Sequence, residues 1–208
     1  MIKRKLIIAT SNRNKVIEIK ELLKHLELEV LSKDELDIDK FETIEDGETL
    51  EENSQKKARD LKERVGHMVI ADDSGLFVKG LNGEPGVHSS RYAGAEGMDD
   101  LNIEKLLDGL KDKDRDAYFK TVVSLIGEDG KTYSVEGTCH GKIAEVPKGT
   151  NGFGYDPIFI PNGYDKTFAE LGNDVKNQIS HRAKALEKLR IVIEELTKDD
   201  KHEDNSNQ

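Results

Sequence analysis

The chain has 208 residues, of which 36% are charged and 35% hydrophobic, and its formal net charge is −10. This length suits one α/β domain with a sizeable hydrophobic core. The acidic balance argues against non-specific binding to nucleic acid or to an anionic membrane, although it does not exclude a local basic pocket. The single cysteine, Cys139, excludes an intramolecular disulfide and a cysteine-rich zinc site.

We expect no secretory signal at the N-terminus. Residues 1–5 are basic, but the apolar run that follows covers only residues 6–9, which is too short for a signal peptide. No segment approaches the ~20 apolar residues that a membrane span requires. We therefore expect a cytoplasmic protein that does not bind membranes.

Residues 6–9 are expected to form a buried strand, and residues 10–15 a polar loop that leads into a helix. The helix is predicted from apolar residues at helical spacing, among them Val16, Ile19 and Leu23. Exposed backbone N–H groups at a helix start attract anions, and Lys15 would add positive charge. The Walker glycine pattern is absent, and a capped helix with a surface lysine explains the segment equally well.

The segment from residue 34 to residue 47 is acidic and precedes a second predicted helix. Thr49 and Glu52 fit a capping box for that helix, which should run to about residue 65. Acidic residues near a helix start stabilise the helix dipole. The alternative is that one of them binds Mg²⁺, which takes one or two carboxylates together with waters and phosphates.

Residues 68–70 are expected to form a buried strand that ends in Asp72, Asp73, Ser74 and Gly75. Ligands of open α/β sheets bind in the crevice beyond the strand ends. On extended chain the two aspartates point in opposite directions, so one can face a ligand while the other plays a structural part. Taken alone, the four residues also fit a solvated acidic turn.

The middle of the chain predicts a mixed sheet. Residues 76–78 form another short apolar run, residues 80–86 a loop rich in glycine, and residues 101–110 a helix. Arg91 fits either a phosphate contact or a structural ion pair. Residues 117–126 and 131–146 are predicted to form a hairpin or meander, and Cys139 is expected to be a buried strand residue. An α/β fold with a mixed sheet follows.

Glycines and aromatic residues alternate near residue 153. Residues 149–157 contain Phe153 and Tyr155 between glycines, so a flat aromatic face could stack on a base, unless both rings pack inward. A strand is expected at residues 158–160. The last helix should open over residues 176–182 with Ser180 as N-cap. His181 and Arg182 oppose the helix dipole there, which favours a ligand contact.

Taken together and in order, these stretches resemble the inosine triphosphate pyrophosphatase family, also called XTP/dITP diphosphatases. The resemblance covers about residues 5–196 and rests on residues 10–15, 45–47, 52–53, 71–75, 83–86, 89–92, 152–157 and 180–182. Each motif alone is weak, whereas the ordered set is specific.

The resemblance implies a two-lobed α/β fold, in which a central mixed sheet is flanked by helices and a nucleotide cleft lies between the lobes. Residues 1–197 would form this single catalytic domain, usually as a homodimer, and residues 198–208 a disordered polar tail. It further implies Mg²⁺-dependent hydrolysis of ITP, dITP and XTP to the monophosphate and pyrophosphate, which removes deaminated purines from the nucleotide pool.

The resemblance also assigns site residues. Asp73 would be the general base or the metal-linked activator of water, and a metal ligand. The substrate would be bound by Thr10, Ser11, Asn12, Arg13, Asn14, Lys15, Ser74, Phe153, Gly154, Tyr155, Asp156, Lys176, His181 and Arg182. Many members carry a carboxylate three residues before the glycine that corresponds to Gly47, where this chain has Ile44. Glu45 is therefore the expected second metal ligand.

Two alternative functions also fit the sequence. A related Maf-type pyrophosphatase would act on other nucleotides, and a regulatory module would bind a nucleotide without turnover. Asp73, Lys15 and the pair His181 and Arg182 favour an enzyme.

Overall fold

A computed structural model describes residues 4–36, 38, 42–95 and 97–204. One mixed sheet has the strand order β2-β1-β3-β5-β6-β7, and the short β4 pairs with β3. Its strands are β1 (Arg4–Ile8), β2 (Leu28–Ser32), β3 (Met68–Val78), β4 (Pro85–Gly86), β5 (Asp116–Ile126), β6 (Thr132–Ile143) and β7 (Phe159–Pro161). β1 runs parallel to β2 and β3, and the remaining pairs are antiparallel. The predicted mixed α/β fold is confirmed.

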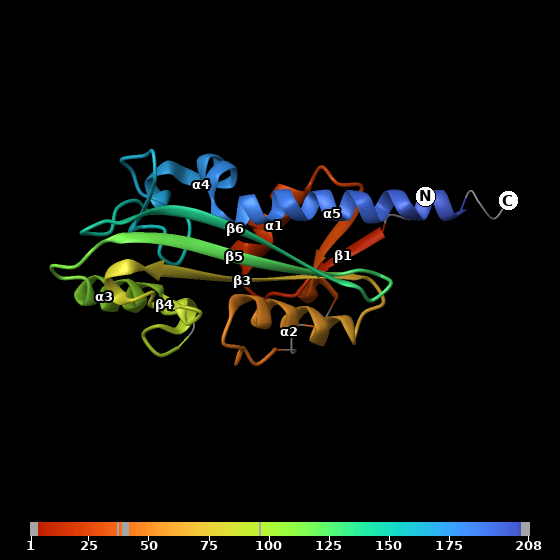
Figure 1. Cartoon of the computed structure of the whole chain (residues 1–208), viewed down its shortest axis with the longest axis horizontal. Helices are drawn as coiled ribbons and strands as arrows, with labels where there is room; N and C mark the ends of the chain where they lie inside the picture. The colour runs from red at the N-terminus through yellow and green to blue at the C-terminus, as the bar shows by residue number, and fades with distance from the viewer. Residues whose placement is uncertain (1–3, 37, 39–41, 96, 205–208) are drawn as a thin grey trace.

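Helices cover both faces of this sheet (Figure 1). They are α1 (Arg13–Leu23), α2 (Leu50–Lys62), α3 (Asp99–Gly109), α4 (Phe168–Ile179) and α5 (His181–Asp204), with 3₁₀ turns η1 (Lys33–Leu36), η2 (Lys79–Leu81) and η3 (Ser89–Arg91). α1 and α5 lie on one face and α2 on the other. None of the described helices combines the length and the apolar character needed to cross a membrane.

Buried side chains form three hydrophobic clusters, which divide the molecule into two lobes. In the first lobe Leu6 and Ile8 of β1 pack toward α1 and α5, whereas Ile7 packs toward α2. Both faces of β1 are therefore buried, which is why its sequence is continuously apolar. The second lobe is built on α3, α4, β7 and the far halves of β3, β5 and β6. The long strands β3, β5 and β6 run through both lobes.

β3 differs from the sequence prediction. Residues 68–70 and 76–78 belong to one strand of 11 residues, so Asp72 and Asp73 lie in its middle and not at its end. Both aspartates are buried. A strand can contain buried carboxylates only when neighbouring side chains balance their negative charge. Cationic side chains do so on both faces of β3.

The C-terminal helices also differ from the sequence prediction. Lys176 lies in the last turn of α4, not in the final helix. Ser180 has extended backbone, with φ −67° and ψ 161°, and its Oγ accepts a hydrogen bond from Ala183 N at 3.1 Å. Ser180 is thus the N-cap of α5, as predicted. α5 runs to Asp204 and so includes the first part of the segment 198–208, where we expected no regular structure; residues 205–208 lie outside the described residues.

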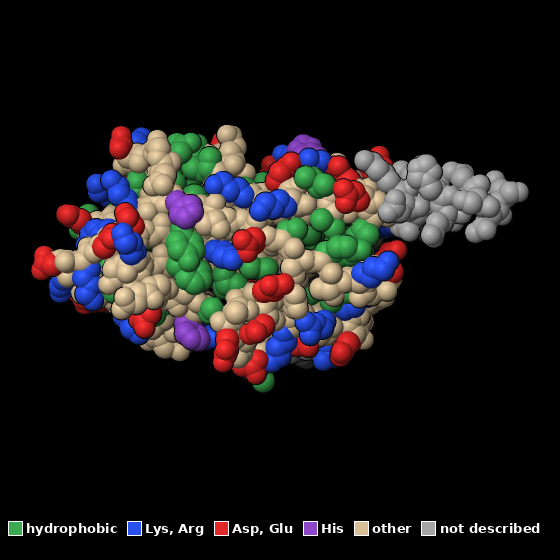
Figure 2. Space-filling view, viewed as in Figure 1, with side chains coloured by type: hydrophobic (Ala, Val, Ile, Leu, Met, Phe, Trp, Pro, Cys, Tyr) green, Lys and Arg blue, Asp and Glu red, His purple; other side chains and the backbone are tan. Residues whose placement is uncertain are grey.

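Charged side chains of both signs are interspersed over the face that Figure 2 shows, with small apolar areas between them. The net charge of −10 is therefore not gathered into one acidic patch on this face. Such a surface is compatible with a local basic pocket, which the net charge does not exclude.

Candidate active site

A cavity of about 500 Å³ opens where the sheet is interrupted beside β3. β1 pairs with β3 only as far as Ile70, and β4 pairs only with Leu76 and Phe77. On the edge of β3 that faces β1 and β4, residues 71–75 therefore pair with neither strand. The opposite edge of β3 pairs with β5. Residues of both lobes line the cavity, and this is the crevice expected beside the carboxyl end of a parallel strand.

The loop after β1 brings the start of α1 to the cavity. Thr10 Oγ1 accepts a hydrogen bond from Asn12 N at 3.2 Å, and Asn12 caps α1 by accepting from Lys15 N at 3.1 Å. Thr10, Ser11, Asn12 and Lys15 all line the cavity. The loop therefore presents hydroxyl and amide groups, a helix N-terminus and one ammonium group, a combination that binds anions.

Arg13 and Asn14 do not line the cavity and are exposed, so their predicted substrate contacts are not supported by this structure. The reason is helical geometry. Asn12 and Lys15 are three residues apart and share one face of the first turn, whereas the two residues between them point elsewhere.

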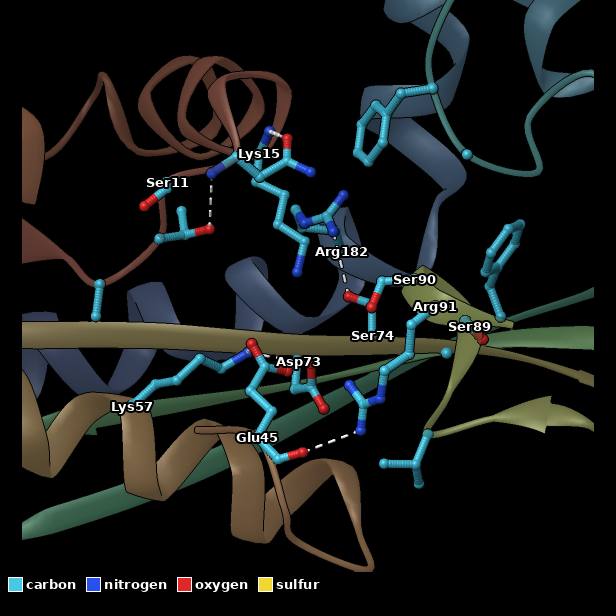
Figure 3. Close-up of a pocket in the computed structure, with 18 of the residues that line it drawn as sticks. Ser11, Lys15, Glu45, Lys57, Asp73, Ser74, Ser89, Ser90, Arg91 and Arg182 are labelled. Carbon is cyan, nitrogen blue, oxygen red and sulfur yellow. Dashed lines mark hydrogen bonds and ion pairs between the residues drawn. The ribbon is translucent and has the colours of Figure 1, made fainter. Parts of the chain in front are cut away.

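Asp72 lies on the α5 side of β3 and has cationic partners (Figure 3 shows the neighbouring Lys15 and Arg182). Its Oδ2 lies 3.1 Å from Lys15 Nζ and 3.1 Å from Arg182 Nη2, and it accepts a hydrogen bond from Ser74 Oγ at 3.2 Å. Burial alone would raise the pKa of Asp72, but Lys15 and Arg182 outweigh burial and hold that pKa well below its usual range. Asp72 is thus the supporting carboxylate that orients two basic side chains.

Phe153 and the residues after it form the far wall of the cavity. Lys176 Nζ lies 4.5 Å from the centroid of the Phe153 ring and 2.6 Å from Asp156 Oδ2, and Asp156 also accepts from Phe153 N at 2.9 Å. Tyr155 is buried and donates to Ser89 O at 2.9 Å. Of the two aromatic side chains, Phe153 is therefore the one placed to stack on a flat ligand.

His181 and Arg182 begin α5 and reach the same wall. The His181 ring stacks on Phe119, with centroids 4.5 Å apart, and its Nδ1 has no hydrogen-bond partner among the described residues. Burial, together with the cationic Arg182 and Lys176, holds the pKa of His181 well below its usual range. A neutral imidazole with an unpartnered nitrogen can donate to or accept from a ligand here.

Glu18 of α1 completes this basic wall, and sequence analysis did not assign it. Its Oε1 lies 2.8 Å from Lys176 Nζ, and its Oε2 pairs with Arg182 Nη1. The network on this side therefore matches three carboxylates, those of Glu18, Asp72 and Asp156, with three cationic side chains. No local pattern reports a contact between residues 18 and 182.

Asp73 lies on the other face of β3, toward α2. Its Oδ2 accepts from Asn53 Nδ2 at 3.2 Å, and its Oδ1 accepts from Lys57 Nζ at 3.1 Å. Lys57 Nζ also lies 3.3 Å from Glu45 Oε1. Ile44, by contrast, is 74% exposed, whereas Glu45 lines the cavity beside Asp73 (Figure 3).

Two carboxylates here share a single ammonium group. Burial raises the pKa of Glu45. Burial would lower the pKa of Lys57, but Asp73 and Glu45 outweigh it and raise that pKa. The local excess of negative charge suits a divalent cation, and no cluster of three acidic, histidine or cysteine ligands occurs in the described parts of the chain. A pair of carboxylates completed by water and phosphate oxygens is the donor set of Mg²⁺.

Asn53 and Lys57 are the residues whose role the sequence could have indicated. Both lie on the apolar face of α2 together with Leu50, Ala58 and Leu61. Polar side chains at core positions of an amphipathic helix need buried partners. Other lining residues that sequence reasoning did not assign to the site include Lys33, Glu42, Ser89, Ser90 and Asp99.

Comparison with known proteins identifies the family of this chain. The Ham1 family model matches residues 6–192. The dITP/XTP pyrophosphatase of Clostridium perfringens is 46% identical over 94% of this chain and 100% of its own length, and that of Bacillus subtilis is 49% identical over 93% and 99%. The solved HAM1 protein of Coxiella burnetii superimposes with a TM-score of 0.83 at 40% identity, covering 92% of this chain and 99% of the other. The resemblance inferred from the motifs is confirmed: this chain belongs to the Ham1 family.

Proposed function

We propose that this protein is an Mg²⁺-dependent pyrophosphohydrolase that converts ITP, dITP and XTP to the nucleoside monophosphate and pyrophosphate. The observation that carries the proposal is one cavity with three chemically distinct walls. They are an anion-binding loop at Lys15, a carboxylate pair at Asp73 and Glu45, and an aromatic and basic wall at Phe153. The relatives named dITP/XTP pyrophosphatase support the choice of substrates.

The triphosphate would lie between the anion-binding loop and the carboxylate pair. Lys15 and the N–H groups at the start of α1 would stabilise the charge that develops on the phosphate oxygens. Asp73 and Glu45 would hold Mg²⁺, which when bound neutralises phosphate charge and polarises the phosphoryl oxygens.

Asp73 would orient the attacking water and accept its proton. The water oxygen forms a bond to the α-phosphorus, the bond from that phosphorus to the bridging oxygen breaks, and pyrophosphate leaves. Asn53 and Lys57 fix the Asp73 carboxylate through the hydrogen bonds at 3.2 Å and 3.1 Å. A positioned general base contributes about 10²–10⁴-fold to the rate.

The base would stack on Phe153 and be recognised by His181 and Arg182. A 6-oxo purine accepts a hydrogen bond at the position where adenine donates one. Donors from Arg182 or His181 therefore favour the oxo base, because an adenine would leave a buried donor without a partner. The neutral state of His181 supports this role, since a neutral ring is cheaper to bury than a charged one.

A substrate panel tests the proposal. Release of pyrophosphate is measured with Mg²⁺ for ITP, dITP and XTP against GTP, ATP, dTTP and UTP. We expect the three deaminated purine nucleotides to give the highest kcat/KM. Highest turnover of dTTP or UTP would favour the Maf-type alternative, and binding without turnover of any nucleotide would favour a regulatory module.

The family resemblance also leads us to propose a cytoplasmic homodimer. Sedimentation equilibrium should then give twice the 23.3 kDa mass of one chain. A monomer mass throughout the concentration range would contradict the dimer without affecting the proposed reaction.

A further inference from the structure

Arg91 lines the cavity but has no part in the reaction as described above. It is the last residue of η3 and is half-buried. Its Nη2 donates a hydrogen bond to the backbone carbonyl oxygen of Glu45 at 2.9 Å (Figure 3). The sequence left Arg91 open between a phosphate contact and an ion pair, and the structure shows a contact with the backbone of the loop that carries Glu45.

The turn that carries Arg91 is firmly anchored. Ser89 Oγ accepts from Leu76 N at 2.8 Å and donates to Gly86 O at 2.6 Å, which ties η3 to β3 and β4. Tyr155 donates to Ser89 O at 2.9 Å, and Asn102 of α3 donates to Ser90 O at 3.3 Å. The Arg91 side chain therefore extends from a fixed base in the second lobe.

The described part of the loop that carries Glu45, residues 42–47, makes no backbone–backbone hydrogen bond with other described residues. Residues 42–47 belong to no helix or strand. Gly47 N donates to Asn53 Oδ1 at 2.8 Å, which fixes the loop to α2 after Glu45. At Glu45 itself, Lys57 Nζ lies 3.3 Å from the carboxylate, and Arg91 holds the backbone from the opposite lobe. If that contact is lost, the Glu45 carboxylate can move relative to Asp73.

We propose that Arg91 is a positioning residue for the metal site: its guanidinium holds the Glu45 backbone so that the Glu45 and Asp73 carboxylates can bind one divalent cation together. The inference rests on the proposed function only in taking that cation to be the Mg²⁺ of the reaction. Groups that orient metal ligands change metal affinity by about 10–100-fold when they are removed.

The test is direct binding of Mn²⁺ to the protein without nucleotide, followed by the loss of the free Mn²⁺ signal in electron paramagnetic resonance. Arg91→Met keeps the aliphatic stem and removes the donors, and we expect its Kd for Mn²⁺ to rise about tenfold. Arg91→Lys retains one donor group and should lose less. Glu45→Gln serves as the reference for a lost ligand. The KM for ITP at saturating Mg²⁺ should stay unchanged in both Arg91 variants.

Arg115→Met is the matched control. Arg115 is also half-buried and also donates to backbone carbonyls, with 2.8 Å from its Nη1 to Ala144 O, but it does not line the cavity. Its replacement should leave the Kd for Mn²⁺ at the value of the unsubstituted protein. Equal losses in Arg91→Met and Arg115→Met would overturn the inference, because they would reflect a general effect on the fold.

The remaining outcomes are also decisive. Unchanged Mn²⁺ affinity in Arg91→Met, with a raised KM for ITP, would make Arg91 a substrate contact and overturn the positioning role. Absence of Mn²⁺ binding to the unsubstituted protein would overturn it as well. Mn²⁺ binding that is weakened in Arg91→Met, in a protein that hydrolyses no ITP, would refute the proposed function and leave the positioning role intact.

Discussion

Asp72 and Asp73 are adjacent in the chain but belong to separate charge networks. Successive residues of a strand point to opposite faces, so Asp72 meets Lys15 and Arg182, whereas Asp73 meets Lys57. The first network balances its charges, and the second leaves one carboxylate in excess when Glu45 is included. This difference is why we assign the proposed metal and water to Asp73, while Asp72 supports the basic wall.

Replacing Asp73 with Asn tests the general base. The amide keeps the shape of the side chain but cannot take a proton from water, so we expect kcat for ITP to fall by about 10²-fold or more. Binding of ITP, measured by calorimetry, should be largely kept. Asp100→Asn, at an exposed position of α3, is the control and should turn over normally. An Asp73→Asn enzyme with ordinary kcat would exclude Asp73 as the base.

The buried His181 should make the free energy of unfolding depend on pH. Burial keeps the pKa of His181 well below its usual range, so below about pH 6.5 the unfolded chain binds a proton at this residue that the folded chain does not. Stability should therefore fall as the pH drops, by at most about 1.4 kcal/mol per pH unit from this residue.

Urea unfolding between about pH 7 and pH 5 measures this effect. His181→Gln cannot titrate and should show a smaller loss of unfolding free energy over that range than the unsubstituted protein. Replacing the exposed His140 with Gln is the control for removing a histidine elsewhere in the chain. Identical slopes for all three proteins would refute the assignment to His181.

At the level of elements, β3 and the loop before α2 carry the carboxylate pair, and α5 carries His181 and Arg182 of the basic wall. β6 and α5 approach closely because position 137 is glycine. A Cβ at Gly137 would lie 2.1 Å from the carbonyl oxygen of His181 and 2.5 Å from Ala185 N. The start of α5, and with it His181 and Arg182, is thus held in place by a residue that never touches the cavity.

Gly137→Ala should therefore impair both stability and substrate binding. Forcing an extra methyl group against this backbone should cost about 1–3 kcal/mol of unfolding free energy, and the displaced His181 and Arg182 should raise the KM for ITP. Gly66→Ala is the matched control, because a Cβ there meets nothing within 4 Å. Urea unfolding and steady-state kinetics measure the two effects, and equal behaviour of the two variants would contradict the packing argument.

At the scale of the whole molecule, the fold and the proposed metal site are separable. The three hydrophobic clusters stabilise the two lobes, whereas Asp73 and Glu45 meet in the cavity between them. Removing divalent cations changes the charge in the cavity but leaves this core intact.

Chelation with EDTA should consequently abolish ITP hydrolysis while the circular dichroism spectrum stays that of the folded protein. Added Mg²⁺ should restore turnover. Hydrolysis that persists after complete chelation would show that the reaction does not need the cation, and loss of the folded spectrum would show that the cation has a structural role.

Much of the fold could be predicted from sequence because its signals are local. The apolar run before Thr10, the capping box at Thr49 and the N-cap Ser180 each depend on residues within about four positions, and the structure contains all three. The ordered motifs likewise identified most of the residues that line the cavity, among them Lys15, Asp73 and Phe153.

Only the tertiary structure decided how these pieces meet. It joined residues 68–70 and 76–78 into one strand through Asp72 and Asp73, because cations from α1, α2 and α5 compensate the carboxylates there. It also brought Glu18 to Arg182, which lies 164 positions away, and Arg91 to Glu45, at a separation of 46. Contacts of this kind leave no periodicity in the sequence, because each depends on where the sheet and helices place two segments that are far apart in the chain.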